Sequence, residues 1–337
     1  MRLGHRLGVL LVALGALATV PACANDPASD GTIRFALDWT PNTNHTGLYV
    51  AIREGLFEQA GLDVEILPYS NTTPDLLVDA GAAEFGISTH SQATFSRAAG
   101  SDTVTVLAPL QHRATAIGVR ADRADLQSPR DLDGLTYAGF GDPGDNETLS
   151  QVIRNDGGTG EFTSVVLGTS AYEAVYSGTA DFTVSYVAWE GLEAQHRGLP
   201  MRYFAHSDYG FPDAYSIVVD GNETWMSEHP DSARAFIQAL QQGYRIAADD
   251  PQRGAQHLID ADPGLFTDES LVFESQQMLS ADYMRDDSGQ VGTLDLERWS
   301  GYSRFLFEAG LLAGADGATL TEEPDWSAYF TDAYLAP

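Results

Sequence analysis

Short apolar runs alternate with amphipathic stretches along most of this chain, beginning at residue 33. The runs suit buried strands, and the stretches between them space apolar residues three and four apart, as helices do. The predicted strands are Ile33–Asp38, Val64–Leu67, Phe85–Ser88, Val104–Ala108, Leu135–Ala138, Ser164–Leu167, Phe182–Val187, Met201–Phe204 and Tyr215–Val219. The predicted helices are Gly47–Gln59, Pro74–Ala82, Gln92–Ala99, Glu147–Asn155, Ala171–Ser177 and Glu190–His196. Such alternation indicates an α/β protein with parallel sheets covered by helices.

The C-terminal part of the chain has a different pattern, which predicts only helices: Pro230–Ala261, Asp268–Met284 and Asp295–Leu312. An apolar stripe on the last of these helices indicates packing rather than a ligand site. It consists of Leu296, Trp299, Phe305, Leu306 and Leu311.

Two further β-like segments, 115–121 and 214–220, lie where the chain would pass between lobes. They predict two α/β lobes joined by two crossing strands, one lobe built from residues 31–113 and 217–337 and the other from residues 114–216. Ligands of open α/β sheets bind at the carboxyl ends of the strands. Two such lobes facing each other would form a cleft that closes on a small molecule.

Residues 1–23 resemble a bacterial lipoprotein signal. Basic residues precede the apolar run Leu7–Val20, which is too short to span a membrane, and Cys23 follows. The expectation is a lipidated Cys23, a tether over residues 24–31, and a protein body anchored at the extracytoplasmic face of the cell membrane. An ordinary secretory signal with a leftover thiol is the alternative.

The net charge of −30 comes from 18 basic and 48 acidic residues. A surface this acidic repels phosphate backbones and anionic lipids, so nucleic acid is excluded as a partner. All the basic residues are arginine. Without lysine, the chain has no side chain that forms an internal Schiff base with a carbonyl cofactor or substrate.

Enzyme signatures are missing from the sequence. It contains no G-x-S-x-G, H-E-x-x-H, C-x-x-C or P-loop motif, and its eight histidines show no recognisable metal-ligand spacing. We therefore predict a protein that is not an enzyme and has neither a cofactor nor a metal.

The first predicted strand ends in an unusual polar corner, "LDWTPNTNH". Turn residues explain part of it. They do not explain why Trp39, Asn42, Asn44 and His45 gather where the sheet ends. We expect this corner to face the cleft.

A second corner, "SYVAWEG", carries Tyr186, Trp189 and Glu190 at the end of another predicted strand. Structural explanations exist, because a carboxylate is stabilised at a helix start and an indole suits a core. The functional hypothesis is that the indoles hold a planar ring and that Glu190 accepts hydrogen bonds from an amino group and an adjacent ring N–H. A planar amino-heterocycle would suit such a site.

Two more strand ends carry candidate residues. "EFGISTHSQ" places Ser88 and His90 at a helix start, where Ser and Thr also serve as caps. "GFGDPGDNET" contributes Gly141 and Asp142 in a loop that resembles a phosphate cradle, although its aspartates would oppose a phosphate. That loop also suits a turn that caps the following helix. "LAPLQHRATA" places Gln111 and His112 just before the first crossing.

These corners resemble a known family, the solute-binding lipoproteins of bacterial ABC importers for the thiamine pyrimidine precursor, of the ThiY type. "LDWTPNTNHTGLYVA", "EFGIS", "LQH", "SPRDLDG", "YAGFG", "WEGLEAQ" and "LDLERWSGYSRFLFEAGLL" carry the likeness, over about residues 31–315. It implies a type II periplasmic-binding fold with a two-strand hinge. It also implies an aminopyrimidine ligand, an ABC permease with its ATPase as partners, and a monomer.

The resemblance also implies roles for individual residues. Trp39 and Asn42 would face the ligand, Glu190 would pair with the aminopyrimidine edge, and Tyr186 and Trp189 would form an aromatic wall. Whether His45, His90 and Tyr215 touch the ligand stays open.

Other functions remain as alternatives. A eukaryotic branch of the same family consists of pyrimidine synthases, and the resemblance places Ser88 at their cofactor-binding lysine and Gln92 at their consumed histidine. The chain has no lysine, and its single cysteine lies in the signal, which closes the enzyme hypothesis. Within the same fold, a flavin, a flavin precursor or another small heterocycle is the alternative ligand. Taurine, nitrate and sulfonate binders are more distant, because Glu190 argues against an anion. An adhesion lipoprotein with an empty cleft is a further alternative.

Overall fold

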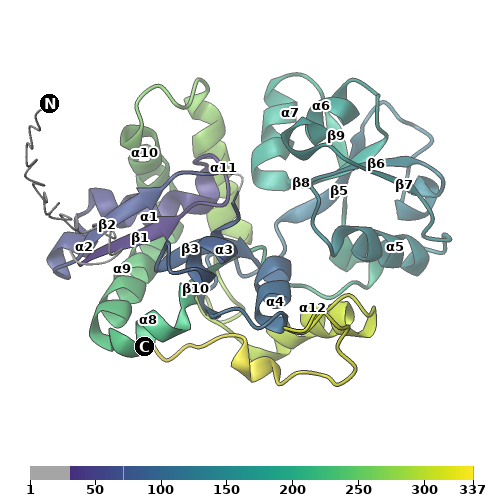
Figure 1. The fold of residues 1–337 in the computed structure, drawn as a ribbon. Coiled ribbons are helices and arrows are strands. Elements are labelled where there is room, and N and C mark those ends of the chain that lie inside the picture. The colour runs from purple at the N-terminus through teal and green to yellow at the C-terminus, as the bar shows by residue number, and fades with distance from the viewer. Residues whose placement is uncertain (1–30, 71, 337) are drawn as a thin grey trace, which may run out of the picture. The chain divides into compact units, whose positions relative to one another are not determined.

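The computed structural model describes residues 31–70 and 72–336. The predicted signal, Cys23 and the tether up to residue 30 lie outside this part of the chain. The described residues form two five-stranded sheets (Figure 1). Every predicted strand is present, and no end is shifted by more than three residues.

The first sheet has the order β2-β1-β3-β10-β4. Its strands are β1 (Thr32–Ala36), β2 (Asp63–Leu67), β3 (Phe85–Thr89), β4 (Thr103–Leu107) and β10 (Ile217–Asn222). Its helices are α1 (Thr46–Arg53), α2 (Leu56–Gln59), α3 (Pro74–Asp79), α4 (His90–Ala98), α8 (Glu223–Glu228), α9 (Pro230–Asp249), α10 (Pro251–Ala261), α11 (Glu269–Asp282) and α12 (Leu296–Glu308). Much of the core lies between this sheet and α9, where Phe236 stacks on Phe85 with 4.4 Å between ring centroids.

The second sheet has the order β7-β6-β8-β5-β9. Its strands are β5 (Thr115–Arg120), β6 (Thr136–Gly139), β7 (Thr163–Val166), β8 (Phe182–Tyr186) and β9 (Met201–Ala205). Helices α5 (Asp145–Asn155), α6 (Ala171–Tyr176) and α7 (Leu192–His196) surround it (Figure 1).

Both sheets are mixed, whereas the sequence predicted parallel ones. β10 runs antiparallel to β3 and β4, and β5 runs antiparallel to β8 and β9. Each of these two strands follows a crossing from the other sheet. After each crossing, the chain enters the new sheet on the side where the other strands have their carboxyl ends. β5 and β10 therefore have to run in the opposite direction to those strands.

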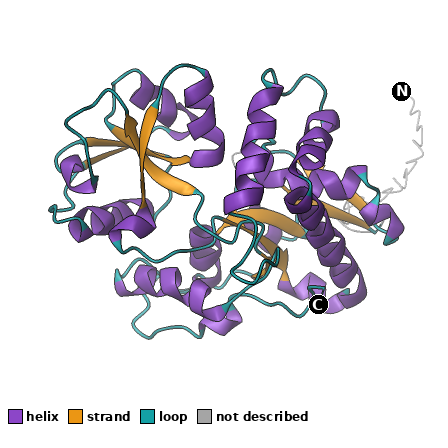
Figure 2. Ribbon diagram, turned by 180° about the vertical axis from the view of Figure 1, so that it is seen from behind, coloured by secondary structure: helices purple, strands orange, loops and turns teal. Residues whose placement is uncertain are grey.

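The crossings themselves are residues 108–114 and 206–216, which are loops with one short 3₁₀ turn, as Figure 2 shows. The segments predicted to cross instead form β5 and β10. Asp213 ties the crossings together, because it accepts the backbone N–H of Arg113 at 3.0 Å and pairs with His112 at 2.7 Å. The lobe boundaries at residues 113 and 216 stay a prediction.

Two predicted helices are each divided in two, for local reasons. Gly55 has a φ of +67°, which a helix does not allow, so it separates α1 from α2. Pro251 lacks the N–H that would continue α9, so α10 starts there. On α12 the predicted stripe is correct for Trp299 and Leu306, which are buried, but Leu296 at the helix start is 47% exposed.

Helices α1 and α9 approach each other through two glycines. A Cβ on Gly243 would lie 2.1 Å from the carbonyl oxygen of Gly47, and a Cβ on Gly47 would lie 2.2 Å from Cγ of Tyr244. Such distances leave no room for a methyl group. The close approach holds α1, and the polar corner that precedes it, against α9.

Gly243→Ala is therefore expected to lower the free energy of unfolding by about 1–3 kcal/mol, through overpacking. Thermal or denaturant unfolding measures this. Gly301→Ala is the matched control, because it also lies within a helix but its Cβ would meet only Pro212 at 3.7 Å. If both variants are equally stable, the helices can separate at no cost and the packing argument is wrong.

Candidate ligand-binding site

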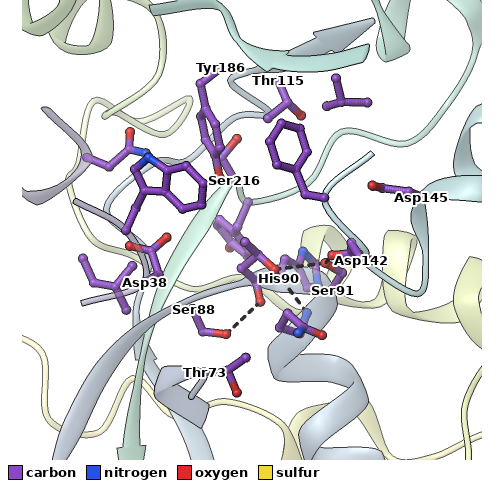
Figure 3. Close-up of a pocket in the computed structure, with 18 of the residues that line it drawn as sticks. Asp38, Thr73, Ser88, His90, Ser91, Thr115, Asp142, Asp145, Tyr186 and Ser216 are labelled. Carbon is purple, nitrogen blue, oxygen red and sulfur yellow. Dashed lines mark hydrogen bonds between the residues drawn. The ribbon is translucent and has the colours of Figure 1, made fainter. Parts of the chain in front are cut away.

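A cavity of about 420 Å³ lies between the two sheets, at the carboxyl ends of most of their strands and at the starts of β5 and β10. From the first sheet, Trp39 follows β1, and Ser88 and His90 lie where β3 passes into α4. From the second sheet, Asp142 follows β6 and Tyr186 ends β8 (Figure 3). The volume suits a small molecule.

Nine of the eleven residues predicted to bind ligand line this cavity. They are Trp39, Asn42, Ser88, His90, Asp142, Tyr186, Trp189, Glu190 and Tyr215. His45 and Gly141 are not among the lining residues.

His45 lies one layer behind the cavity. It is fully buried, and its Nδ1 accepts the backbone N–H of Asn42 at 3.2 Å. The proton is therefore on Nε2, which donates to Asp38 Oδ1 at 2.8 Å. Asp38 does line the cavity. His45 thus orients the corner that sequence analysis had assigned to ligand contact.

Asn42 is partly engaged within its own corner. Its side-chain oxygen accepts the N–H of Asn44 at 2.9 Å, and its amide nitrogen donates to the carbonyl of Thr40 at 3.1 Å. One further donor hydrogen remains for a ligand.

Gly141 is exposed and has φ +96°, a conformation that favours glycine. The turn at this residue allows both of its neighbours, Phe140 and Asp142, to line the cavity. Its role is thus to shape the loop.

Aromatic rings from both sheets meet at the cavity. Trp39 lies 5.2 Å from Tyr69 and contacts Phe140 edge-on at 6.5 Å, measured between ring centroids. Phe140 in turn lies 5.0 Å from Tyr172. Trp189 also lines the cavity and contacts Phe266 at 6.0 Å. These surfaces suit a flat ring.

Glu190 is the least satisfied acidic group of the cavity. It lies in the π-helical turn η4 (Val187–Gly191) and is 7% exposed, and its Oε2 has no hydrogen-bond partner. Burial raises its pKa to about 7, although hydrogen bonds from its own backbone N–H, from Tyr186 and from Tyr172 oppose the rise. A buried acceptor without a donor is costly, so this oxygen is suited to a ligand donor.

Ser88 already has a strong partner. Its hydroxyl donates to the two carboxylate oxygens of Asp75 at 2.9 and 3.0 Å. Burial raises the pKa of Asp75, and burial together with the charge of Asp75 raises the pKa of the neighbouring buried Asp220.

Several residues that were not predicted as site residues also line the cavity, among them Asp38, Phe140, Tyr172, Tyr302 and Arg113. Arg113 directly follows Gln111 and His112, which were noted but do not line the cavity. Gln111 donates to the backbone carbonyls of Ala108 and Thr293, both at 2.9 Å. Phe140 lies inside a noted loop, whereas no local pattern marks Tyr302 on the distant helix α12.

Within residues 31–70 and 72–336, two features that would suggest other functions are absent. No three His, Cys, Asp or Glu side chains there are grouped as metal ligands. No helix in that part of the chain combines the length and apolar character needed to cross a membrane.

Two α/β lobes with a cavity at their facing strand ends define the two-lobed solute-binding-protein fold. The solved structure of the alkanesulfonate-binding protein SsuA from Xanthomonas axonopodis, bound to MOPS, has this fold. It matches with a TM-score of 0.66 and 16% identity, over 92% of this chain and 99% of that chain. At that identity the likeness concerns the fold alone.

The chain belongs to the NMT1/THI5-like family, whose model matches residues 42–254. It is 30% identical to the formylaminopyrimidine-binding protein of Halalkalibacterium halodurans, over 84% of this chain and 88% of that protein. It is also similar, at 21% identity, to the 4-amino-5-hydroxymethyl-2-methylpyrimidine phosphate synthase THI13 of Saccharomyces cerevisiae, over 71% and 74% of the two chains.

The raised pKa of Glu190 predicts how stability depends on pH. Between pH 4.5 and about 7 the unfolded chain has ionised this group while the folded protein retains its proton, so folding stability falls as the pH rises. Glu190→Gln removes this pH dependence of the folding stability. Its stability relative to wild type should increase from pH 4 to pH 8 by up to about 3 kcal/mol.

Thermal or denaturant unfolding at several pH values tests this expectation. Glu193→Gln, which removes a 43% exposed carboxylate from the same segment, is the control. A constant difference between Glu190→Gln and wild type across that pH range would mean that Glu190 is not buried as described.

Proposed function

We propose that this protein is the solute-binding component of an ABC importer that captures a thiamine pyrimidine precursor, hydroxymethyl- or formamidomethyl-aminopyrimidine. It would be anchored through lipidated Cys23 at the extracytoplasmic face of the membrane, as a monomer, and would deliver the ligand to a permease and its ATPase. The unpartnered oxygen of Glu190 beside an aromatic wall is the observation that carries this proposal.

The chemistry of the ligand fits this site. An aminopyrimidine presents an amino group next to a ring nitrogen, and a carboxyl group can bond to both at once. Its flat ring suits the surfaces of Trp39, Tyr186 and Trp189. The printed name of the Halalkalibacterium relative supports the same class of ligand.

The synthase alternative lacks its chemical requirement. Ser88, where the resemblance places the synthase lysine, donates to Asp75 and has no amine. The family's yeast synthases are similar to this chain at lower identity than the binding protein is. A binding function without catalysis is therefore the proposal.

Titration of the purified protein separates the ligand classes. The aminopyrimidines should bind and change the fluorescence of Trp39 and Trp189, while riboflavin, thiamine and taurine should bind at least tenfold more weakly. Saturation by riboflavin alone would overturn the precursor assignment, and no response to any compound would overturn the receptor function.

Substitutions of Glu190 should weaken aminopyrimidine binding in a graded way. Glu190→Gln retains an acceptor and a donor but loses the charge-assisted bond, which is expected to cost about 1–2 kcal/mol, and Glu190→Ala should cost about 2–4 kcal/mol. Isothermal titration calorimetry measures both, with Glu193→Gln as the control. Unchanged affinity in Glu190→Ala would show that Glu190 only supports the turn.

A further inference from the structure

Helix α11, in the lobe that contains the first sheet, contacts the lobe that contains the second sheet. It packs against α7 and against the π-helical turn η4 (Figure 1). Trp189 of η4 lies on a small apolar cluster of the first lobe, together with Phe266 and Phe273. The ring centroids of Trp189 and Phe266 are 6.0 Å apart, with the rings edge to face. Because Trp189 also lines the cavity, one wall of the cavity is attached to the opposite lobe here.

His196, on α7 of the second lobe, lies between two carboxylates of the first lobe. Its Nδ1 is 2.7 Å from Oδ2 of Asp268, and its Nε2 is 3.0 Å from Oε2 of Glu274. A carboxylate only accepts hydrogen bonds, so both ring nitrogens have to donate and the imidazole is a cation. The His196 side chain is 20% exposed, which shields the two pairs partly from water and salt.

Asp268 is positioned by its own lobe. It is the N-cap of α11, and its Oδ1 accepts the backbone N–H of Ser270 at 3.1 Å and that of Leu271 at 3.3 Å. The other oxygen, Oδ2, is the one that bonds to His196. The start of a helix also stabilises a negative charge. The acceptor is therefore oriented and charged before the lobes meet.

The other charged groups near His196 on its own lobe are engaged elsewhere. Arg197 pairs with Glu173 of α6 at 2.5 Å and with Glu193 at 3.7 Å. Glu190 of η4 lines the cavity. The positive charge of His196 is therefore balanced by the first lobe, across the boundary between the lobes.

We propose that His196, Asp268 and Glu274 form a latch that holds the lobes closed, with Trp189 and Phe266 as its apolar part, and that deprotonation of His196 weakens the latch. The hydrogen bonds with Asp268 and Glu274 raise the pKa of His196 above its ordinary value of 6.5. The latch is therefore complete below pH 6.5, and it is lost as the pH rises through the raised value. This inference goes beyond the proposed function, because the latch acts with or without a ligand.

Small-angle X-ray scattering of the purified protein without ligand tests the latch. The radius of gyration of wild type should be larger at pH 9 than at pH 6, and that of His196→Gln should be equally large at both. His257→Gln is the matched control and should behave as wild type, because His257 pairs with Glu54 at 2.6 Å within the first lobe and is 22% exposed. Equal radii for wild type and His196→Gln at pH 6 would overturn the latch.

Asp268→Asn separates the latch from the support of α11. Asparagine also caps helices, so the helix start should be retained and thermal unfolding should stay close to that of wild type. The charged acceptor for His196 is lost, so the lobes should open at pH 6 as in His196→Gln. A folded Asp268→Asn protein that stays as compact as wild type at pH 6 would contradict the latch.

Ligand release gives a second measurement, which rests on the proposed function. At pH 6, stopped-flow fluorescence should show that His196→Gln releases an aminopyrimidine about threefold to tenfold faster than wild type, as expected for the loss of two partly exposed ion pairs. At pH 9 the two rates should be equal. Variant and wild type are compared at the same pH, because burial also raises the pKa of Glu190 and that of Asp145 to about 7.

The two measurements separate the latch from the proposed function. Equal release rates at pH 6 would contradict the latch but leave the proposed function intact. If wild type binds none of the aminopyrimidines, the proposed function fails, and the scattering of the ligand-free protein still decides whether the latch exists.

Discussion

The burial of one carboxyl group without enough donors is the constraint on which the site depends. Glu190 lies in an aromatic wall, and the oxygen that lacks a partner belongs to a group whose ionisation is already opposed by burial. An anion cannot satisfy it, but an amino group beside a ring nitrogen can. A ring nitrogen lone pair and a carboxylate repel each other, so the bound pair has to share one proton. Under the proposed function, neutral or weakly basic heterocycles are therefore the ligands that this wall would select.

The rest of the fold brings residues of both sheets to the same cavity as that wall. Each sheet presents strand ends to the cavity, and the chain crosses between the sheets at segments that Asp213 ties together. Arg113 lies on one of these crossings and also lines the cavity. Glu190 and Arg113 both line the cavity with buried polar atoms that lack partners, which is a costly arrangement for the fold alone. A ligand that forms hydrogen bonds with both groups would offset this cost.

Much of the fold and part of the site could be predicted from the sequence, for reasons that differ by residue. Strand ends in parallel segments share an edge, so Trp39, Tyr186 and Glu190 could be placed together from local patterns. The same logic left the role of His45 open, because a polar side chain at a strand end can support the corner instead of facing the cavity. The predicted strand direction was wrong for β5 and β10, which pair antiparallel with their neighbours. Local sequence patterns carry no information about the side from which the chain enters a sheet. Tyr302 comes from a helix almost two hundred residues away from Arg113, and only tertiary packing brings them together.

Proton uptake on binding is the most direct test of the carboxyl–ring pair. Calorimetry at pH 8, in two buffers with different ionisation enthalpies, reports the number of protons taken up with the ligand. With a Glu190 pKa of about 7 in the free protein, nearly one proton per bound aminopyrimidine should be taken up, and none should be taken up in Glu190→Ala. Binding by wild type without proton uptake would contradict the account, because Glu190 would then remain an ionised bystander.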